Sequence, residues 1–258
     1  MFNVFTTALL IPFSRSLVKL SQFVIREKKS PDEFSVKYID ERILQTPAIA
    51  LAQLIKEMSY MLEVAQRALD KAMDNFINRT EDEEPVRKDL REINFLSGKV
   101  TDYLIRLSEE DMSHNDELTV SSLYKVLSDI MRVADFSNNI MRYLRVAVAN
   151  ELYFSSEGLN EIKEMYSLVD ELFKDVDYTF ANRTTRLLAK IEDTESKTDK
   201  FKLQLQQNHL DRLKGGNCKS ESSSLYVNLI GNIERVADHL VYICLLYTSP
   251  SPRDRQKS

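Results

Sequence analysis

Three short phrases occur twice in this chain, in the same order both times. Each second copy lies about 100 residues after the first, which indicates a tandem duplication. A duplicated chain is expected to fold as two similar halves, and this expectation restricts the fold more than any other feature of the sequence. The pairs are IKEM at 55–58 and 162–165, FINRT at 76–80 with FANRT at 180–184, and IMRVAD at 130–135 with IERVAD at 233–238.

Apolar residues recur at helical spacing through the middle of the chain, and no segment alternates like a β-strand. Five glycines and six prolines among 258 residues leave room for long uninterrupted helices. The sequence predicts an all-α fold of two tandem antiparallel three-helix bundles, preceded by an apolar and amphipathic N-terminal helix. The expected helices cover residues 48–76, 86–107, 118–150, 158–180, 184–213 and 220–243.

The N-terminal stretch differs from the rest of the chain. Residues 2–13 carry no charge, but they fall short of the ~20 apolar residues that a membrane-spanning helix needs. Basic residues then alternate with apolar ones as far as residue 29. Three interpretations stay open: the end of a last transmembrane helix, an interfacial amphipathic helix, or an ordinary first helix packed on the bundle.

These features divide the chain into five parts. We expect residues 1–29, here called the membrane-associated stretch, to be the end of a last transmembrane helix and its juxtamembrane segment. Residues 30–45 are a linker, 46–150 the first repeat, 151–243 the second repeat, and 244–258 a tail. The tail loses helical periodicity and resembles a translated sequencing-library adaptor. We therefore expect residues 244–258 to be non-native.

Composition argues against several classes of function. A formal net charge of −5 disfavours a nucleic-acid partner, because phosphate neutralisation needs clustered Lys and Arg. Cys218 and Cys244 form neither a disulfide framework nor a zinc pattern. No glycine-rich phosphate loop or activated nucleophile is recognisable, and His114, His209 and His239 have no triad-like company. From these features we predict that the chain is not an enzyme, and we assign no catalytic residue.

Carboxylates four residues apart mark the last two expected helices. Glu195 and Asp199 form one pair, and Glu234 and Asp238 form the other, each on one face of its helix. Because these helices are antiparallel neighbours in a three-helix bundle, the four carboxylates can face one another. Such a set suits a divalent metal such as Mg²⁺, Mn²⁺ or Ca²⁺, or an iron cluster.

A metal-free alternative is that these acids form salt bridges with Lys and Arg on neighbouring helices. Arg132 and Arg235 lie inside the repeated phrases and are ready partners. His239 directly follows Asp238 but points about 100° away on a helix, so it is an outer ligand or a surface residue.

The first repeat holds a partial copy of the acidic set. Asp102 and Asp135 correspond to the two aspartates of the second repeat. Gly98 and Met131 stand where the second repeat has its two glutamates. Half the ligand charge predicts weaker cation binding in the first repeat.

The phrase ERVADH at 234–239 resembles the ERIGDH-type signature of PhoU domains. Members of that family are two-repeat, six-helix proteins that regulate phosphate uptake and carry E/D-x-x-x-D metal motifs. The resemblance implies a full set of metal positions in the second repeat and a partial set in the first. The full set is Glu195, Asp199, Glu234 and Asp238, and the partial set is Asp102 and Asp135.

A second resemblance is more specific. NHLDRL at 208–213, followed by GNC at 216–218, resembles the segment before the last helix in the cytoplasmic tail of bacterial Na⁺/phosphate cotransporter-like proteins. FNVFTT at 2–7 and LIPF at 10–13 resemble the end of that family's final membrane helix. The resemblance covers residues 1–243. It implies a C-terminal fragment with a cytoplasmic PhoU-like regulatory domain of a Na⁺-coupled inorganic phosphate transporter in the cell membrane.

The same resemblance implies the partners. The domain would dock on the membrane portion of its own transporter, where an upstream region handles sodium and phosphate, and it allows a homodimer. Two alternatives stay open: a stand-alone PhoU-type regulator of phosphate transport, and a metal-free helical interaction adaptor.

Overall fold

The computed structural model describes residues 34–216 and 220–248, without the side chains of residues 220 and 246–248. The chain divides into two units, Met1–Ser35 and Val36–Ser258. The expected membrane-associated stretch, residues 1–29, lies outside the described residues, as do residues 249–258 of the expected tail.

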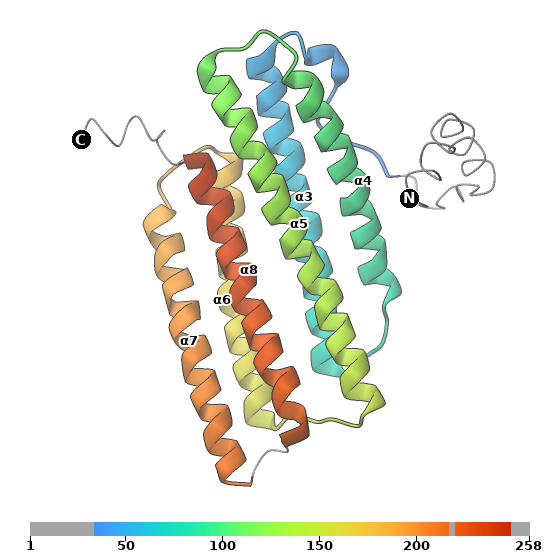
Figure 1. Cartoon of the computed structure of the whole chain (residues 1–258), viewed down its shortest axis with the longest axis vertical. Helices are drawn as coiled ribbons and strands as arrows, with labels where there is room; N and C mark the ends of the chain where they lie inside the picture. Colours follow the sequence, from blue (N-terminus) through green and yellow to red (C-terminus); the bar gives the residue numbers. More distant parts are fainter. Residues whose placement is uncertain (1–33, 217–219, 249–258) are drawn as a thin grey trace, which may run out of the picture. The chain divides into compact units, whose positions relative to one another are not determined.

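The predicted fold class is confirmed. The described residues of the second unit form α-helices and two short 3-10 turns, and no strand occurs among them. Successive helices run in opposite directions (Figure 1). The α-helices are α3 (Pro47–Asn78), α4 (Glu84–Leu107), α5 (His114–Ala149), α6 (Ser156–Ala181), α7 (Leu188–Lys214) and α8 (Ser223–Thr248). The 3-10 turns are η2 (Glu41–Ile43) and η3 (Ser220–Ser222).

Helix ends follow local capping chemistry. Pro47 occupies the first turn of α3, where a missing backbone N–H costs nothing. The Ser113 side chain accepts a hydrogen bond from Asp116 N, so α5 begins at His114, four residues before the predicted start. The Ser155 side chain caps α6 in the same way. A polar cap of this kind fixes a helix start that apolar periodicity alone does not reveal.

The repeated FxNRT phrase ends α3 and α6 with the same backbone geometry. Arg79 and Arg183 have left-handed φ values of 55° and 53°. Thr80 N donates to Asn75 O at 2.9 Å, and the corresponding Thr184 N donates to a carbonyl at 3.2 Å. This is the Schellman pattern of helix termination. The turn after α6 delays α7 until Leu188, four residues after its predicted start.

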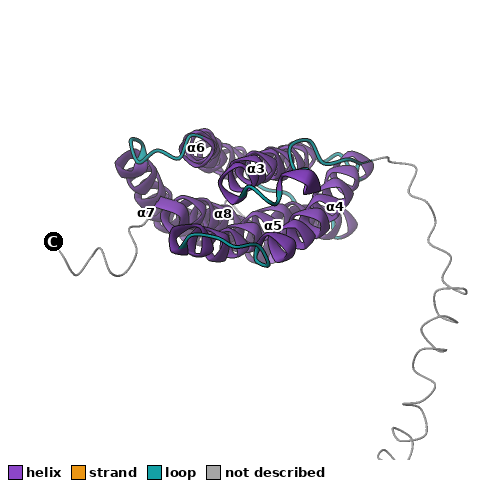
Figure 2. Ribbon diagram, turned by 90° about the horizontal axis from the view of Figure 1, so that it is seen from above, coloured by secondary structure: helices purple, strands orange, loops and turns teal. Residues whose placement is uncertain are grey.

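The two repeats share one hydrophobic core. Figure 2, viewed along the helices, shows α3, α5, α6 and α8 at the centre, with α4 and α7 at opposite ends. Corresponding helices of the two repeats contact each other directly, α3 with α6 and α5 with α8. A continuous cluster of buried side chains runs through both repeats, and each large one stabilises the fold by about 1.5–3 kcal/mol. Its fully buried members include Leu54, Met61, Leu69, Phe173 and Phe180.

Part of the predicted linker is bound to the bundle. In residues 36–39, here called the strap, the backbone N–H groups of residues 37–39 point to the carboxylate of Glu57, which is 0% exposed on α3. Lys37 N lies 2.9 Å, Tyr38 N 2.6 Å and Ile39 N 3.3 Å from Glu57 Oε2. The Lys37 ammonium also lies 3.2 Å from the centre of the Tyr60 ring. The second half of the stretch 30–45 is therefore not a free linker, because a buried carboxylate holds it in place.

The last helix extends past its predicted end. Sequence periodicity ends it at residue 243, whereas α8 continues to Thr248. Ile243 and Cys244 are both 0% exposed and continue the apolar stripe of the helix. The non-native origin of residues 244–258 stays a prediction. No helix within the described residues has the length and apolarity that crossing a membrane requires.

Candidate functional site

Three carboxylates meet where α7 lies against α8. Glu195 and Asp199 are one turn apart on α7, and Asp238 reaches them from the antiparallel α8. One oxygen from each of the three, here called the acidic trio, lies within 4.8 Å of the others. Asp199 Oδ1 is buried and has no hydrogen-bond partner among the described residues. Three of the four metal positions expected in this repeat therefore converge.

The fourth expected ligand, Glu234, is engaged differently. Its carboxylate forms an ion pair with Lys202 Nζ at 2.9 Å, and the two side chains are only 16% and 25% exposed. The salt-bridge alternative therefore holds for Glu234, but with a partner that the sequence did not single out. Arg132 and Arg235 form no ion pair with another described residue.

The acidic trio is electrostatically crowded. Burial, followed by the charges of Asp199, Asp238 and Glu234, raises the pKa of the Glu195 carboxyl. Burial also raises the pKa of Asp238, and Glu234 and Asp199 raise it further. A cation among these oxygens would replace repulsion with attraction, and hard divalent cations prefer carboxylate oxygens. The donor set, its spacing and the unpaired Asp199 oxygen all fit such an ion.

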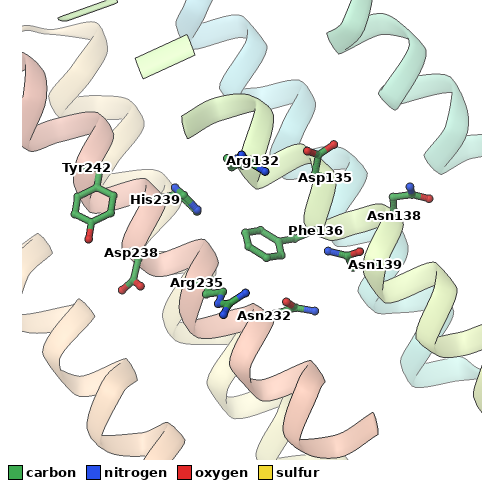
Figure 3. A pocket seen from close by; sticks show the side chains of 10 residues that line it. All are labelled: Arg132, Asp135, Phe136, Asn138, Asn139, Asn232, Arg235, Asp238, His239 and Tyr242. Carbon is green, nitrogen blue, oxygen red and sulfur yellow. The ribbon is translucent and has the colours of Figure 1, made fainter. Parts of the chain in front are cut away.

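A groove lies beside the acidic trio, between the corresponding helices α5 and α8. This inter-repeat groove has a volume of about 540 Å³. Figure 3 shows its polar and aromatic walls, and Asp238 belongs to both the groove and the acidic trio. Its lining residues are Arg132, Asp135, Phe136, Asn138, Asn139, Asn232, Arg235, Asp238, His239 and Tyr242.

Two side chains of the groove are held by neighbours in the bundle. His239 Nδ1 lies 2.9 Å from Asp129 Oδ1, which ties α8 to α5. Asn232 Nδ2 donates to the Tyr143 hydroxyl at 2.8 Å. His239 is therefore part of the groove wall, neither a ligand of the acidic trio nor a free surface residue.

The two repeats each match a known family. The PhoU domain matches residues 58–144 and 162–246, which fall on α3–α5 and α6–α8. The chain belongs to the PhoU domain family.

Two relatives of this PhoU chain are named for phosphate transport. One is YjbB of Salmonella typhimurium, named for inorganic phosphate export, which is 21% identical over 245 residues. The match covers 91% of this chain but only 44% of YjbB. The other is a Thermotoga maritima PhoU homologue, named an accessory protein of a phosphate-specific transport system. It is 24% identical over 202 residues, which cover 75% of this chain and 84% of that protein.

The first PhoU repeat does not assemble an equivalent trio. Asp102 on α4 and Asp135 on α5 are both exposed, and no group of three possible ligands is found there among the described residues. Met131 packs against the core instead of supplying an oxygen. A Cβ at Gly98 would meet nothing within 4 Å, so its face of α4 is open. Among the described residues, three of the four predicted ligands of the second repeat converge, and no such group of three forms in the first.

The second PhoU repeat also contains a polar cluster that the sequence did not reveal. Glu161 on α6 accepts hydrogen bonds from Asn208, from both terminal nitrogens of Arg212 at 2.9 and 2.7 Å, and from the Tyr226 hydroxyl at 2.5 Å. The buried His209 ring stacks on the Tyr226 ring with 4.7 Å between the ring centres, and burial lowers the pKa of His209. These contacts join α6, α7 and α8. The NHLDRL phrase therefore supplies side chains that hold the three helices of this repeat together.

Proposed function

We propose that this PhoU chain regulates phosphate transport, and that it does so as the cytoplasmic regulatory domain of a Na⁺-coupled inorganic phosphate transporter in the cell membrane. The observation that carries the proposal is the PhoU match in both repeats, together with relatives named for phosphate transport. YjbB supports the transporter context, because the match leaves more than half of that longer protein uncovered.

In this proposal the PhoU bundle acts by binding, and no residue has a catalytic role. Its helices dock on the membrane portion of the transporter, where sodium and phosphate are handled. Docking shifts the transporter between states only to the extent that the bundle binds one state more tightly than the other. Rigid helices on a shared core suit this role, because they present their side chains in a fixed arrangement.

We further propose that the acidic trio holds a divalent cation or part of an iron cluster. Glu195, Asp199 and Asp238 would be its ligands, and Glu234 would join them if Lys202 moved away. The bound ion would supply positive charge that ties α7 to α8. The buried Asp199 oxygen without a partner supports this assignment.

Phosphate flux in cells tests the regulatory role. Radiolabelled phosphate uptake and export should change when the chain is deleted, and the change should depend on external sodium. A sodium-independent change would favour the stand-alone regulator, a role that the 84% coverage of the Thermotoga protein supports. Unaltered flux in both directions would refute the regulatory role itself.

Membrane sedimentation tests the location. The full chain should pellet with membranes, and a variant without residues 1–29 should pellet less. Equal solubility of the two would count against the transporter context and leave the stand-alone alternative.

Elemental analysis of the purified chain tests the metal. We expect bound iron, manganese or another divalent metal in the wild type, and its loss in the variant combining Glu195→Gln and Asp199→Asn. Asp193→Asn is the matched control, because Asp193 lies on the same helix, is 62% exposed and pairs with Lys197. A metal content that is zero, or equal in all three proteins, would favour the metal-free adaptor.

A further inference from the structure

We propose that the inter-repeat groove binds a nucleoside monophosphate, with Arg132 and Arg235 holding its phosphate group. The groove needs no metal for this role, although Asp238 lies in its wall as well as in the acidic trio. The inference therefore goes beyond the proposed regulatory function and does not depend on it.

The two arginines carry the phosphate half of the argument. Arg132 comes from α5 and Arg235 from α8, at the same position of the repeated IxRVAD phrase, and both line the groove. Neither guanidinium has a hydrogen bond or ion pair with another described residue, whereas Arg67 and Arg212 are engaged with carboxylates. A guanidinium presents a planar fork of donors that matches phosphate oxygens. Two such forks, one from each wall, are available to a phosphate group in the groove.

An aromatic wall of the groove suits a planar group. The Tyr242 ring is half exposed and lies 6.2 Å from the His239 ring, so it offers a face for stacking a base. Asn138 lies at the opposite end of the groove from Tyr242 (Figure 3), and Asn139 Oδ1 already accepts a hydrogen bond from Arg142 at 3.3 Å, so neither amide is assigned to the base. Phe136 is largely buried and lies 6.0 Å from the His239 ring, which makes it part of the apolar floor.

The charge and size of the groove narrow the class of ligand that it can bind. Two carboxylates, Asp135 and Asp238, line the same groove as the two arginines. A phosphate monoester carries a charge of about −1.5 to −2 at neutral pH, which the arginine pair can neutralise. A triphosphate would place further negative charge beside those carboxylates. The volume of about 540 Å³ lies in the range of organic-ligand sites, roughly 300–1,000 Å³, so inorganic phosphate alone would leave most of the groove unused.

Calorimetric titration of the full chain tests the inference, with adenosine monophosphate, inorganic phosphate and adenosine as probes and a chelator in the buffer. Adenosine monophosphate should bind more tightly than either part. Arg132→Gln and Arg235→Gln should each weaken its binding about tenfold or more, because each removes charge-assisted hydrogen bonds. Tyr242→Ala should weaken the nucleotide but leave inorganic phosphate unchanged.

Lys125→Gln is the matched control, because Lys125 is an exposed cation of α5 outside the groove. It should bind adenosine monophosphate like the wild type, and circular dichroism should show equal helix content in all variants. Glu195→Gln with Asp199→Asn should also leave nucleotide binding intact, so failure of the metal assignment would not disturb this test. Wild-type protein that ignores the nucleotide, or binds phosphate or adenosine equally well, would overturn the proposal. Affinity that survives both arginine substitutions would overturn it too.

Discussion

The α7–α8 face of the second repeat and the α4–α5 face of the first have the same helical frame but different charge. Both keep an aspartate at each corresponding position, Asp199 with Asp102 and Asp238 with Asp135. On the α7–α8 face, Glu195 completes the acidic trio. On the α4–α5 face its place is taken by Gly98.

The position of Lys202 shows how the second repeat tolerates its added acids. Lys202 pairs with Glu234 at 2.9 Å. In the first repeat, Met131 replaces that glutamate, and Ile105 replaces the lysine when counted with the shift that relates Glu195 to Gly98. The glutamate and the lysine are thus both present in the second repeat and both absent from the first. The comparison teaches that a duplicated scaffold can concentrate charge on one copy, provided that a compensating cation accompanies it.

At the strap the comparison runs the other way, because here the first repeat carries the buried acid. Glu57 and Glu164 occupy the same place in the repeated IKEM phrase, yet only Glu57 is buried. Glu57→Ala would leave strap N–H groups of residues 37–39 without their acceptor, so we expect a loss of about 3 kcal/mol in the free energy of unfolding. Glu164→Ala, its exposed counterpart, should change stability by about 0.5 kcal/mol or less. Urea unfolding measures the loss of stability in both variants, and equal losses would contradict this contrast.

The ion pair of the α7–α8 face gives the next largest effect. Lys202→Met should destabilise the metal-free protein by about 2 kcal/mol, because Glu234 and its acidic neighbours lose their cation. Lys197→Met breaks an exposed pair with Asp193 on the same helix and should cost at most about 0.5 kcal/mol. Thermal unfolding in chelator measures both. Similar losses for the two lysines would mean that Lys202 offsets no special crowding.

A smaller effect depends on pH. The folded pKa values of Glu195 and Asp238 are raised, so the folded protein holds these protons more tightly than the unfolded chain does. Above the raised pKa of Glu195 its charged carboxylate lies among repelling neighbours, so Glu195→Gln should be more stable than the wild type without metal. That advantage should shrink as the pH falls through the raised pKa of Glu195. Urea midpoints from neutral to acidic pH measure it, and an advantage independent of pH would contradict the crowding.

The smallest effect concerns the open position of the first repeat. Gly98→Ala should stabilise α4 by about 0.5–1 kcal/mol, because the helix interior disfavours glycine and a Cβ meets no atom there. Gly98→Glu should keep most of that gain, since its neighbour Asp102 is exposed and screened by solvent. Thermal unfolding compares the two. A glutamate that abolished the gain would show that the α4–α5 face is as crowded as the α7–α8 face.

Much of the fold follows from the sequence, because apolar periodicity reports which helix face is buried. The errors lie at helix ends, where Ser113 begins α5 early and buried Cys244 carries α8 further. Convergence of the acidic trio was predictable from i, i+4 spacing on adjacent helices. Pairing of Lys202 with Glu234 was not, because it depends on the rotation and register of α7 against α8.

Two other features required the three-dimensional structure. The inter-repeat groove exists because α5 lies against α8, a contact between residues about 100 positions apart that no local pattern encodes. The strap was missed because Glu57 bonds backbone N–H groups, which every residue type but proline provides. The sequence shows the acid, but not which main-chain groups it binds.

The shared core has a consequence for how this protein melts. Since α3 packs on α6 and α5 on α8, neither copy keeps its apolar surface covered when the other opens. Both halves should therefore unfold in one cooperative transition, with calorimetric and van't Hoff enthalpies equal. A metal ion or ligand that binds and stabilises either half would then raise the melting temperature of the whole bundle.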